Sequence, residues 1–249
     1  MIFSDLHTHT IFCDGHSTPE EMVKSAIEKG LKRIGLLMHS YIPNSFYEPF
    51  NYEKQEEFIK CVNSLKIKYA DKIEVLCGLE NDYFSTPTKN KFDYIIGSLH
   101  LFNKGNRFLD IDRSLFHFEE AVKELFDGDY YLMAEWYYEN ISNIFEKTNA
   151  DIIGHFDLIT KFNIDNRFFD QKHPRYISAY QKAVDKLVKY NKPFEVNTGA
   201  IARGYQNFPY PDKDIIEYIK KKGGSLILSS DAHNKDDIAF EYQKWAQLI

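Results

Sequence analysis

Histidines and carboxylates recur at short, regular spacings in this chain of 249 residues, which contains nine histidines. His7 and His9 are separated by one residue, and in a strand a period of two places both imidazoles on the same face. Asp231 and His233 repeat that spacing near the other end of the chain, and Glu80 offers a carboxylate able to bridge two cations. Imidazole and carboxylate ligands without thiolates are typical of Zn, Fe(II) or Mn sites rather than of structural zinc. The pattern therefore predicts a metal site of this kind.

The elements that must position these residues are seven short apolar runs, which have the length and character of buried parallel strands. They cover residues 2–6, 33–38, 73–77, 93–97, 151–154, 193–196 and 225–228. Helical stretches fill most of the gaps: from the Thr18 cap to Gly30, about 52–69, 116–147 with a break near Gly128, 174–190, 211–222 and 235–247. Seven strands alternating with helices predict an α/β fold.

Every one of these runs ends in polar residues, at the carboxyl end where parallel sheets and barrels place their chemistry. In chain order the residues are Asp5, His7 and His9; His39; Glu80 and Asp82; His100; His155 and Asp157; Glu195 and Asn197; and Asp231 and His233. A single histidine at such a place is more often a hydrogen-bonded packing residue than a ligand. The complete set favours a metal site, because a closed barrel would bring all of these side chains to one rim.

Composition excludes several other classes of protein. The sequence has 31 Lys and Arg against 37 Asp and Glu, and the net charge of −6 argues against a nucleic-acid or anionic-membrane surface. Three cysteines with no CxxC spacing argue against a disulfide framework. Without an 18-residue apolar run or a basic and then apolar N-terminus, we expect no membrane span and no secretory signal, hence a cytoplasmic protein.

Eight segments, in order, resemble motifs of the polymerase and histidinol phosphatase (PHP) family of metal-dependent phosphoesterases. They are DLHTHT at 5–10, CDGHSTPEEM at 13–22, MHSY at 38–41, GLEND at 78–82, GSLH at 97–100, GHFDLITKF at 154–162, EVNTGAIARG at 195–204 and SSDAH at 229–233. The resemblance covers nearly the whole chain. It implies a distorted (β/α)7 TIM-like barrel made of one domain, residues 1–249.

The resemblance also implies a site for three divalent metal ions, Zn, Fe or Mn. The implied ligands are His7, His9, Glu80 and Asp231 for the first metal; Glu80, His100 and His155 for the second; and His39 and His233 for the third. Either Asp14 or His16 completes the third set, with a slight preference for His16 because its imidazole matches the other two ligands. Many relatives have Asp before the strand-two histidine where this chain has Met38, which predicts a weaker third site.

Metal ions at such a site lower the pKa of bound water to about 7 and neutralise phosphoryl oxygens, which predicts phosphate ester hydrolysis by a metal-bound hydroxide. Asp231 is the expected proton shuttle, with His39 and His233 as competing candidates. Arg203, which matches an arginine of the histidinol phosphate phosphatase branch, and Lys161 are expected at the phosphate. Glu48 or Asp82 is the expected partner for a substrate ammonium group, near an aromatic loop at 40–50.

The resemblance thus implies hydrolysis of L-histidinol phosphate to L-histidinol and phosphate in histidine biosynthesis. One alternative is a PHP phosphoesterase acting on another small phosphate, such as a nucleotide, a sugar phosphate or phosphotyrosine. A second alternative, a metal-binding module without catalysis, is disfavoured because the full ligand set is present. For either enzyme, the expected partner is a small-molecule phosphate ester. We expect no binding to nucleic acid or to a membrane.

Overall fold

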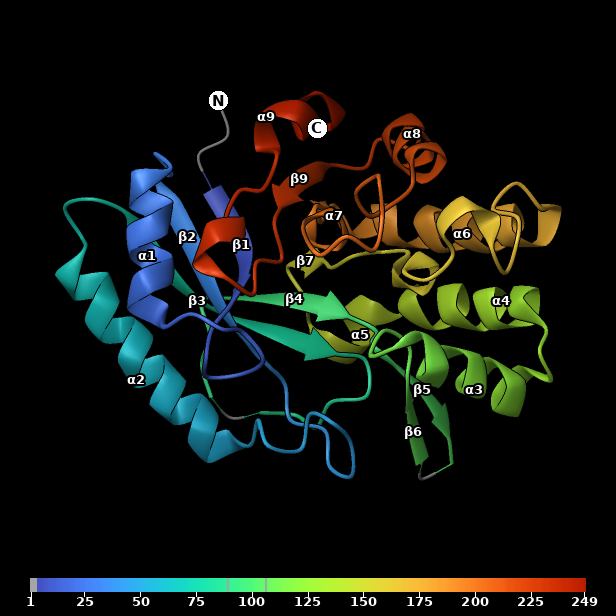
Figure 1. Ribbon diagram of the computed structural model, residues 1–249, viewed down its shortest axis with the longest axis horizontal. Helices are drawn as coiled ribbons and strands as arrows, with labels where there is room; N and C mark the ends of the chain where they lie inside the picture. The colour runs from blue at the N-terminus through green and yellow to red at the C-terminus, as the bar shows by residue number, and fades with distance from the viewer. Residues whose placement is uncertain (1–3, 89, 106) are drawn as a thin grey trace.

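Seven parallel strands form the centre of the molecule in a computed structural model that describes residues 4–88, 90–105 and 107–249 (Figure 1). The sheet has the order β1-β2-β3-β4-β7-β8-β9. Its strands are β1 (Ser4–His9), β2 (Arg33–His39), β3 (Glu74–Asp82), β4 (Tyr94–Ser98), β7 (Ile152–Ile153), β8 (Phe194–Asn197) and β9 (Leu226–Ser229). All seven predicted strands are present, although residues 2 and 3 of the first lie outside the described residues.

The sheet curves into a nearly closed barrel. Just beyond β9, Ala232 pairs in parallel with Thr8 of β1, and its carbonyl accepts the His9 N–H at 2.8 Å. The interior between the strands is filled by one cluster that includes Leu37, Tyr94 and Ile96. A Cβ added to Gly35 would lie 1.9 Å from the Tyr94 hydroxyl, so only glycine fits opposite this ring. The predicted distorted (β/α)7 barrel is confirmed.

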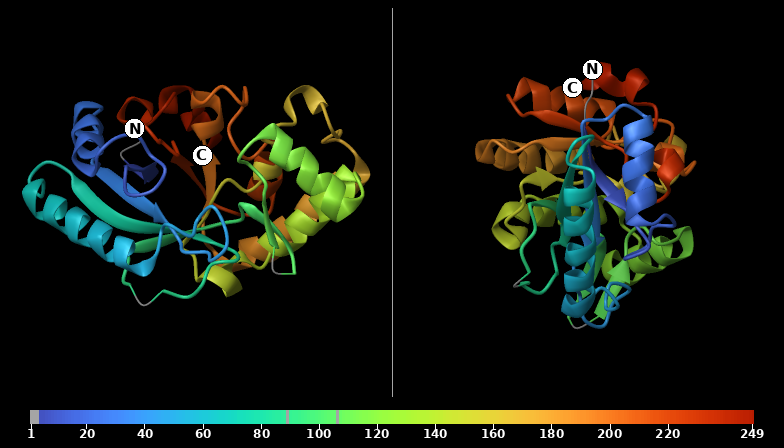
Figure 2. Two further views of the ribbon diagram at one scale, coloured as in Figure 1. Left: turned by 60° about the horizontal axis from the view of Figure 1, so that its bottom comes forward. Right: turned by 90° about the vertical axis from the view of Figure 1, so that its left-hand side faces the viewer.

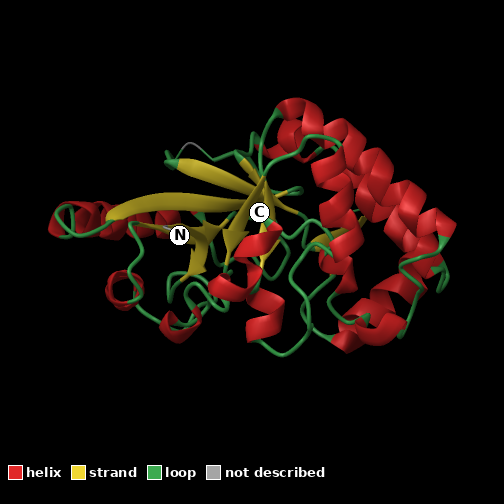
Figure 3. Ribbon diagram, turned by 90° about the horizontal axis from the view of Figure 1, so that it is seen from above, coloured by secondary structure: helices red, strands yellow, loops and turns green. Residues whose placement is uncertain are grey.

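Helices surround the strands on several sides (Figure 3). They are α1 (Pro19–Glu28), α2 (Tyr52–Lys68), α3 (Leu115–Phe126), α4 (Tyr130–Ile141), α5 (Ile144–Thr148), α6 (Pro174–Leu187), α7 (Gly199–Ala202), α8 (Lys213–Lys221) and α9 (Tyr242–Trp245). Among the described residues, no helix is long and apolar enough to cross a membrane. The α2 helix lies along β3 (Figure 2), where Phe58, Val62 and Leu65 pack in one cluster with Val75 and Cys77.

The start of α1 follows the sequence prediction closely. The Thr18 hydroxyl accepts the Glu21 N–H at 3.3 Å, and the Glu21 carboxylate accepts the Thr18 N–H at 2.8 Å, which forms the expected capping box. The stretch predicted at 116–147 is divided into α3, α4 and α5. The break predicted near Gly128 is confirmed, because α3 ends with Asp127 in the left-handed conformation, and a second break separates α4 from α5.

The prediction of a helix at 235–247 is wrong. Only α9 and short 3₁₀ turns form there, and Ala239 and Glu241 have positive φ angles of 53° and 50°. The cause is a tertiary contact, because the Ala239 N–H donates to the buried Asp5 carboxylate at 3.0 Å and so ties the segment to β1.

Two antiparallel strands were not predicted from the sequence. The strands β5 (Leu101–Lys104) and β6 (Arg107–Asp110) form an antiparallel hairpin directly after the end of β4. The Ile111 N–H donates to the His100 carbonyl at 2.9 Å, which holds the end of β6 beside the barrel rim. This hairpin therefore adds residues 110–113 to the neighbourhood of the strand ends.

Candidate metal centre

The carboxyl ends of the strands bring nine of the ten predicted metal ligands together. These nine are His7, His9, Asp14, His39, Glu80, His100, His155, Asp231 and His233. The strands β1 and β3 extend further than predicted, so that His7, His9 and Glu80 lie within regular strand rather than after it. Their alternation in the extended backbone turns these side chains into the barrel.

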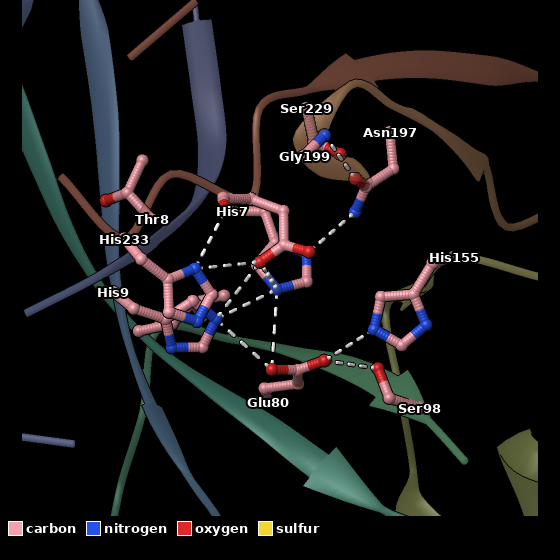
Figure 4. Close-up of polar contacts among 12 residues, drawn as sticks. His7, Thr8, His9, Glu80, Ser98, His155, Asn197, Gly199, Ser229 and His233 are labelled. Carbon is pink, nitrogen blue, oxygen red and sulfur yellow. Dashed lines mark hydrogen bonds and ion pairs between the residues drawn. The ribbon is translucent and has the colours of Figure 1, made fainter. Parts of the chain in front are cut away.

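The first group is formed by His7, His9 and Glu80 (Figure 4). The Nε2 atoms of His7 and His9 are 3.1 Å apart, and the Glu80 Oε2 atom lies 3.4 and 3.2 Å from them. The Asp231 Oδ1 atom lies 3.5 and 3.6 Å from the same two nitrogens. Two ligands about 2.0–2.1 Å from one tetrahedral ion lie roughly 3.3 Å apart. His7, His9 and Glu80 have the separations that a shared cation requires, and Asp231 has a similar separation from the two histidines.

The second group uses the other oxygen of the same glutamate. The Glu80 Oε1 atom lies 3.2 Å from His100 Nε2 and 3.0 Å from His155 Nε2, and these two nitrogens are 3.2 Å apart. The two oxygens of Glu80 therefore face two different groups of imidazoles, which is the arrangement of a bridging carboxylate.

The third group consists of His9, Asp14, His39 and His233. The Asp14 Oδ2 atom lies 3.3 Å from His39 Nε2 and 3.2 Å from His233 Nε2. The slight preference for His16 is corrected, because His16 is exposed and belongs to none of the three groups. Its backbone N–H donates to the His233 carbonyl, which places Asp14 rather than His16 over the barrel mouth.

Further carboxylates orient the imidazoles from behind. Glu195 Oε1 is 2.7 Å from His7 Nδ1, and its second oxygen accepts the His155 N–H. Asp82 Oδ2 accepts the His100 N–H at 2.8 Å and lies 3.2 Å from Nδ1 of the same ring. From the sequence, Glu195 was noted only as a polar strand end, whereas Asp82 was also expected at a substrate ammonium group. Carboxylates that hold the far nitrogen of a histidine set its tautomer and raise its basicity as a ligand.

The departure at Met38 has a structural explanation. Its side chain is fully buried in the apolar cluster that includes Met22 and Phe58, and therefore points to the opposite face of β2 from His39. The imidazole of His39 instead has Asp14 and Glu80 as polar neighbours.

The charges of the site balance one another. Burial works against the charged form of Glu80, but His100, His7 and His39 hold its pKa well below the usual value. Burial similarly opposes the charged form of His7, while Glu195, Asp231 and Glu80 raise its pKa well above the usual value. Burial and the neighbouring His233 lower the pKa of His9 to about 4. Ionised carboxylates and a neutral His9 are the protonation states that metal ligation needs, and His7 has to release its proton to bind a metal.

A cavity of about 250 Å³ opens above the three groups. Its remaining lining comes mostly from loops and consists of Phe46, Tyr47, Asp110, Asp112, Arg113, Leu158, Lys161, Arg203, Tyr205 and Tyr210. Arg203 donates to the Asp231 carbonyl at 2.8 Å and to its Oδ2 atom at 3.1 Å. Lys161 donates to the Asp112 carbonyl at 2.7 Å and lies 3.2 Å from its carboxylate. Both predicted phosphate-binding cations therefore reach the cavity.

The two acids expected at a substrate ammonium group do not line this cavity. Glu48 is exposed, and its carboxylate accepts the Asn44 N–H at 3.1 Å within its own loop. Asp82 is buried against His100. Besides the predicted metal ligands, the acids that line the cavity are Asp110, at the end of β6, and Asp112, just after it. They were missed because the hairpin was not predicted. Their spacing around the buried Ile111 is the signal that could have identified them.

A parallel barrel with buried imidazoles and carboxylates grouped at one rim defines a protein built to hold divalent metal ions, since the ligand types suit such ions. The PHP domain model matches residues 5–199. The chain belongs to the PHP domain family.

Similar proteins align over almost the whole chain. The histidinol-phosphatase of Bacillus subtilis is 23% identical and covers 98% of this chain and 98% of its own length. Among solved structures, the HisK protein of Listeria monocytogenes has a TM-score of 0.84 at 21% identity and covers 97% of this chain and 99% of its own. Histidinol phosphate phosphatase from Lactococcus lactis, complexed with Zn, L-histidinol and phosphate, has a TM-score of 0.68 at 22% identity, with 99% of this chain and 92% of that one covered.

Proposed function

We propose that this chain hydrolyses L-histidinol phosphate to L-histidinol and inorganic phosphate, as the reaction of a histidinol-phosphatase. The observation that carries the proposal is the alignment of named histidinol-phosphatases along nearly the entire chain, combined with a complete cluster of ligand side chains at the barrel rim. The cavity above the cluster, about 250 Å³ in volume, suits a small phosphate ester rather than a polymer.

Three divalent ions, Zn, Fe or Mn, are the proposed cofactors. The first is assigned to His7, His9, Glu80 and Asp231, the second to Glu80, His100 and His155, and the third to Asp14, His39 and His233. When bound, such ions neutralise phosphoryl oxygens and make water acidic near neutral pH. The separations of 3.0–3.6 Å between imidazole nitrogens and carboxylate oxygens support this assignment, because two ligand atoms of one tetrahedral cation lie roughly 3.3 Å apart.

Asp231 is the proposed group for proton transfer. Burial opposes its charged form, but Arg203, His7 and His233 hold the pKa of Asp231 well below its usual value. Asp231 is therefore ionised at neutral pH. Its position on the cavity wall beside Arg203 is the reason to assign it proton transfer between the attacking water and the leaving alcohol. His39 and His233 are the competing groups, since both face the cavity beside Asp14.

Arg203 and Lys161 are proposed to hold the phosphate. The guanidinium already lies against the Asp231 carboxylate, so an ester seated there is placed directly beside the proton-transfer group. Lys161 is held by Asp112 on the other side of the cavity. A guanidinium can donate two hydrogen bonds to a phosphate, which fixes its orientation as well as its charge.

The test is release of inorganic phosphate under steady-state conditions with Mn²⁺ or Zn²⁺ added, using L-histidinol phosphate, p-nitrophenyl phosphate and a nucleotide monophosphate. We expect kcat/KM to be at least tenfold higher for L-histidinol phosphate. If either of the other two esters is hydrolysed as fast or faster, the substrate of this protein is a small phosphate ester other than L-histidinol phosphate. The Arg203→Lys variant should lose most of its activity on all three esters, because an ammonium group cannot replace the two parallel N–H donors of the guanidinium.

A further inference from the structure

The hairpin β5–β6 leads into an acidic turn, residues 110–112, which lines the same cavity as the predicted metal ligands. In this turn Asp110 and Asp112 lie on either side of Ile111, whose side chain is fully buried. The Ile111 N–H is fixed to the His100 carbonyl at 2.9 Å, so the turn cannot move independently of the strand end that supplies a ligand. Two carboxylates thus face the substrate cavity from a rigid support.

The two acids differ in how well their charges are satisfied. Asp112 is paired with Lys161, whose ammonium contacts both its carboxylate and its carbonyl. Within the part of the chain that the structure describes, the charged partner of Asp110 is Arg113, whose Nη1 atom lies 3.8 Å from Asp110 Oδ2. The Asp110 side chain is only 18% exposed. Burial raises the pKa of the Asp110 carboxyl; Arg113 opposes this shift and Asp112 adds to it. A carboxylate so placed gains from a close N–H donor.

The surroundings of Asp110 match a flat, cationic ligand. Phe46 and Tyr47 reach the same cavity from the loop after β2. The Arg113 guanidinium lies 5.4 Å from the centre of the Phe46 ring, so Arg113 joins the hairpin side of the cavity mouth to the aromatic side. L-histidinol phosphate carries an ammonium group and an imidazole, and a wall of carboxylate and aromatic faces is complementary to both.

We propose that Asp110 determines specificity by accepting an N–H from the nitrogen-bearing end of the substrate while the phosphate occupies the metal side. This inference rests on the proposed function, because it assigns a recognition role within the same reaction. Asp110 is a specificity residue that contributes nothing to bond cleavage. Loss of the Asp110 carboxylate therefore slows the hydrolysis of esters that carry an N–H donor and leaves the hydrolysis of other esters unaffected.

The experiment compares the wild type with Asp110→Asn on four esters: L-histidinol phosphate, its analogue without the amino group, L-alaninol phosphate, which keeps the amino group but lacks imidazole, and p-nitrophenyl phosphate. We expect kcat/KM for L-histidinol phosphate to fall at least tenfold, mainly through KM, as for loss of a hydrogen bond to a charged group. Hydrolysis of p-nitrophenyl phosphate should stay within twofold. The penalty should disappear for the analogue that lacks the contacted group, which identifies it as ammonium or imidazole.

Asp71→Asn is the matched control, because Asp71 is an exposed aspartate in the turn before β3 and the substitution removes the same charge. It should change none of the four rates. An equal loss by Asp110→Asn on all four esters, or no loss on L-histidinol phosphate, overturns the assignment. If the wild type hydrolyses none of the three alcohol phosphates, the proposed function is wrong and the role of Asp110 falls with it.

Discussion

The barrel rim and the cavity mouth are built in different ways. At the rim, side chains such as His7 and Glu80 are buried, arise from regular strands and lie within 3.6 Å of several charged neighbours. At the mouth, Phe46 and Arg113 come from loops and Asp110 from the last position of β6, and the ion pair between Asp110 and Arg113 is long, at 3.8 Å. A buried polar cluster tolerates little change because each unpaired group is costly, whereas half-exposed loop residues can vary. The difference supports the proposal that the rim supplies the chemistry and the mouth selects the substrate.

The largest expected effect is at the centre of the rim. Glu80→Gln removes the charge that faces two groups of imidazoles, so metal content and kcat should both fall. We expect activity to fall by more than about 100-fold, because 100-fold is the upper end for loss of a residue that only orients a metal ligand. Metal analysis and phosphate release measure the two losses. Glu74→Gln on the same strand, where Glu74 forms an exposed pair with Arg33, is the control and should behave as the wild type. Full activity in Glu80→Gln would remove the distinction between rim and mouth.

A smaller loss of activity is expected from changing Glu195, which contacts the predicted ligands His7 and His155. Glu195→Gln keeps the shape of the side chain but weakens its hold on the His7 imidazole and the His155 N–H. We expect a loss of roughly 10–100-fold in metal affinity. Titration of chelated protein with Mn²⁺ measures it, and activity should recover at saturating metal. A defect that persists at saturation would mean that Glu195 acts on the reaction rather than on the ligands.

The smallest effect is expected at the edge of the mouth. Glu48→Gln should leave KM for L-histidinol phosphate within twofold of the wild-type value, because the Glu48 carboxylate is exposed and accepts the Asn44 N–H in its own loop. A severalfold rise in KM would bring this loop into the substrate site and weaken the role assigned to the hairpin.

The same contrast explains what could be predicted from the sequence. The rim was predictable because strand alternation and apolar runs locate His7, His9 and Glu80 without knowledge of distant contacts. Asp14 could not be separated from His16, since the choice depends on where a loop crosses His39 and His233. The helix expected at 235–247 failed for a similar reason, because the distant Asp5 binds its backbone.

The mouth was harder to predict. The hairpin follows β4 with no intervening turn signal, so Asp110 and Asp112 were not recognised, and the aromatic loop suggested Glu48 instead. Loop side chains are placed by tertiary contacts such as that of Ile111 with His100, which have no periodic signature in the sequence.

The most direct test of the account is the metal stoichiometry of the purified wild-type protein, measured by inductively coupled plasma mass spectrometry beside phosphate release from L-histidinol phosphate. The account predicts close to three divalent ions per chain, loss of hydrolysis after chelation, and recovery when Mn²⁺ or Zn²⁺ is restored. Hydrolysis at full rate by protein free of metal would contradict it.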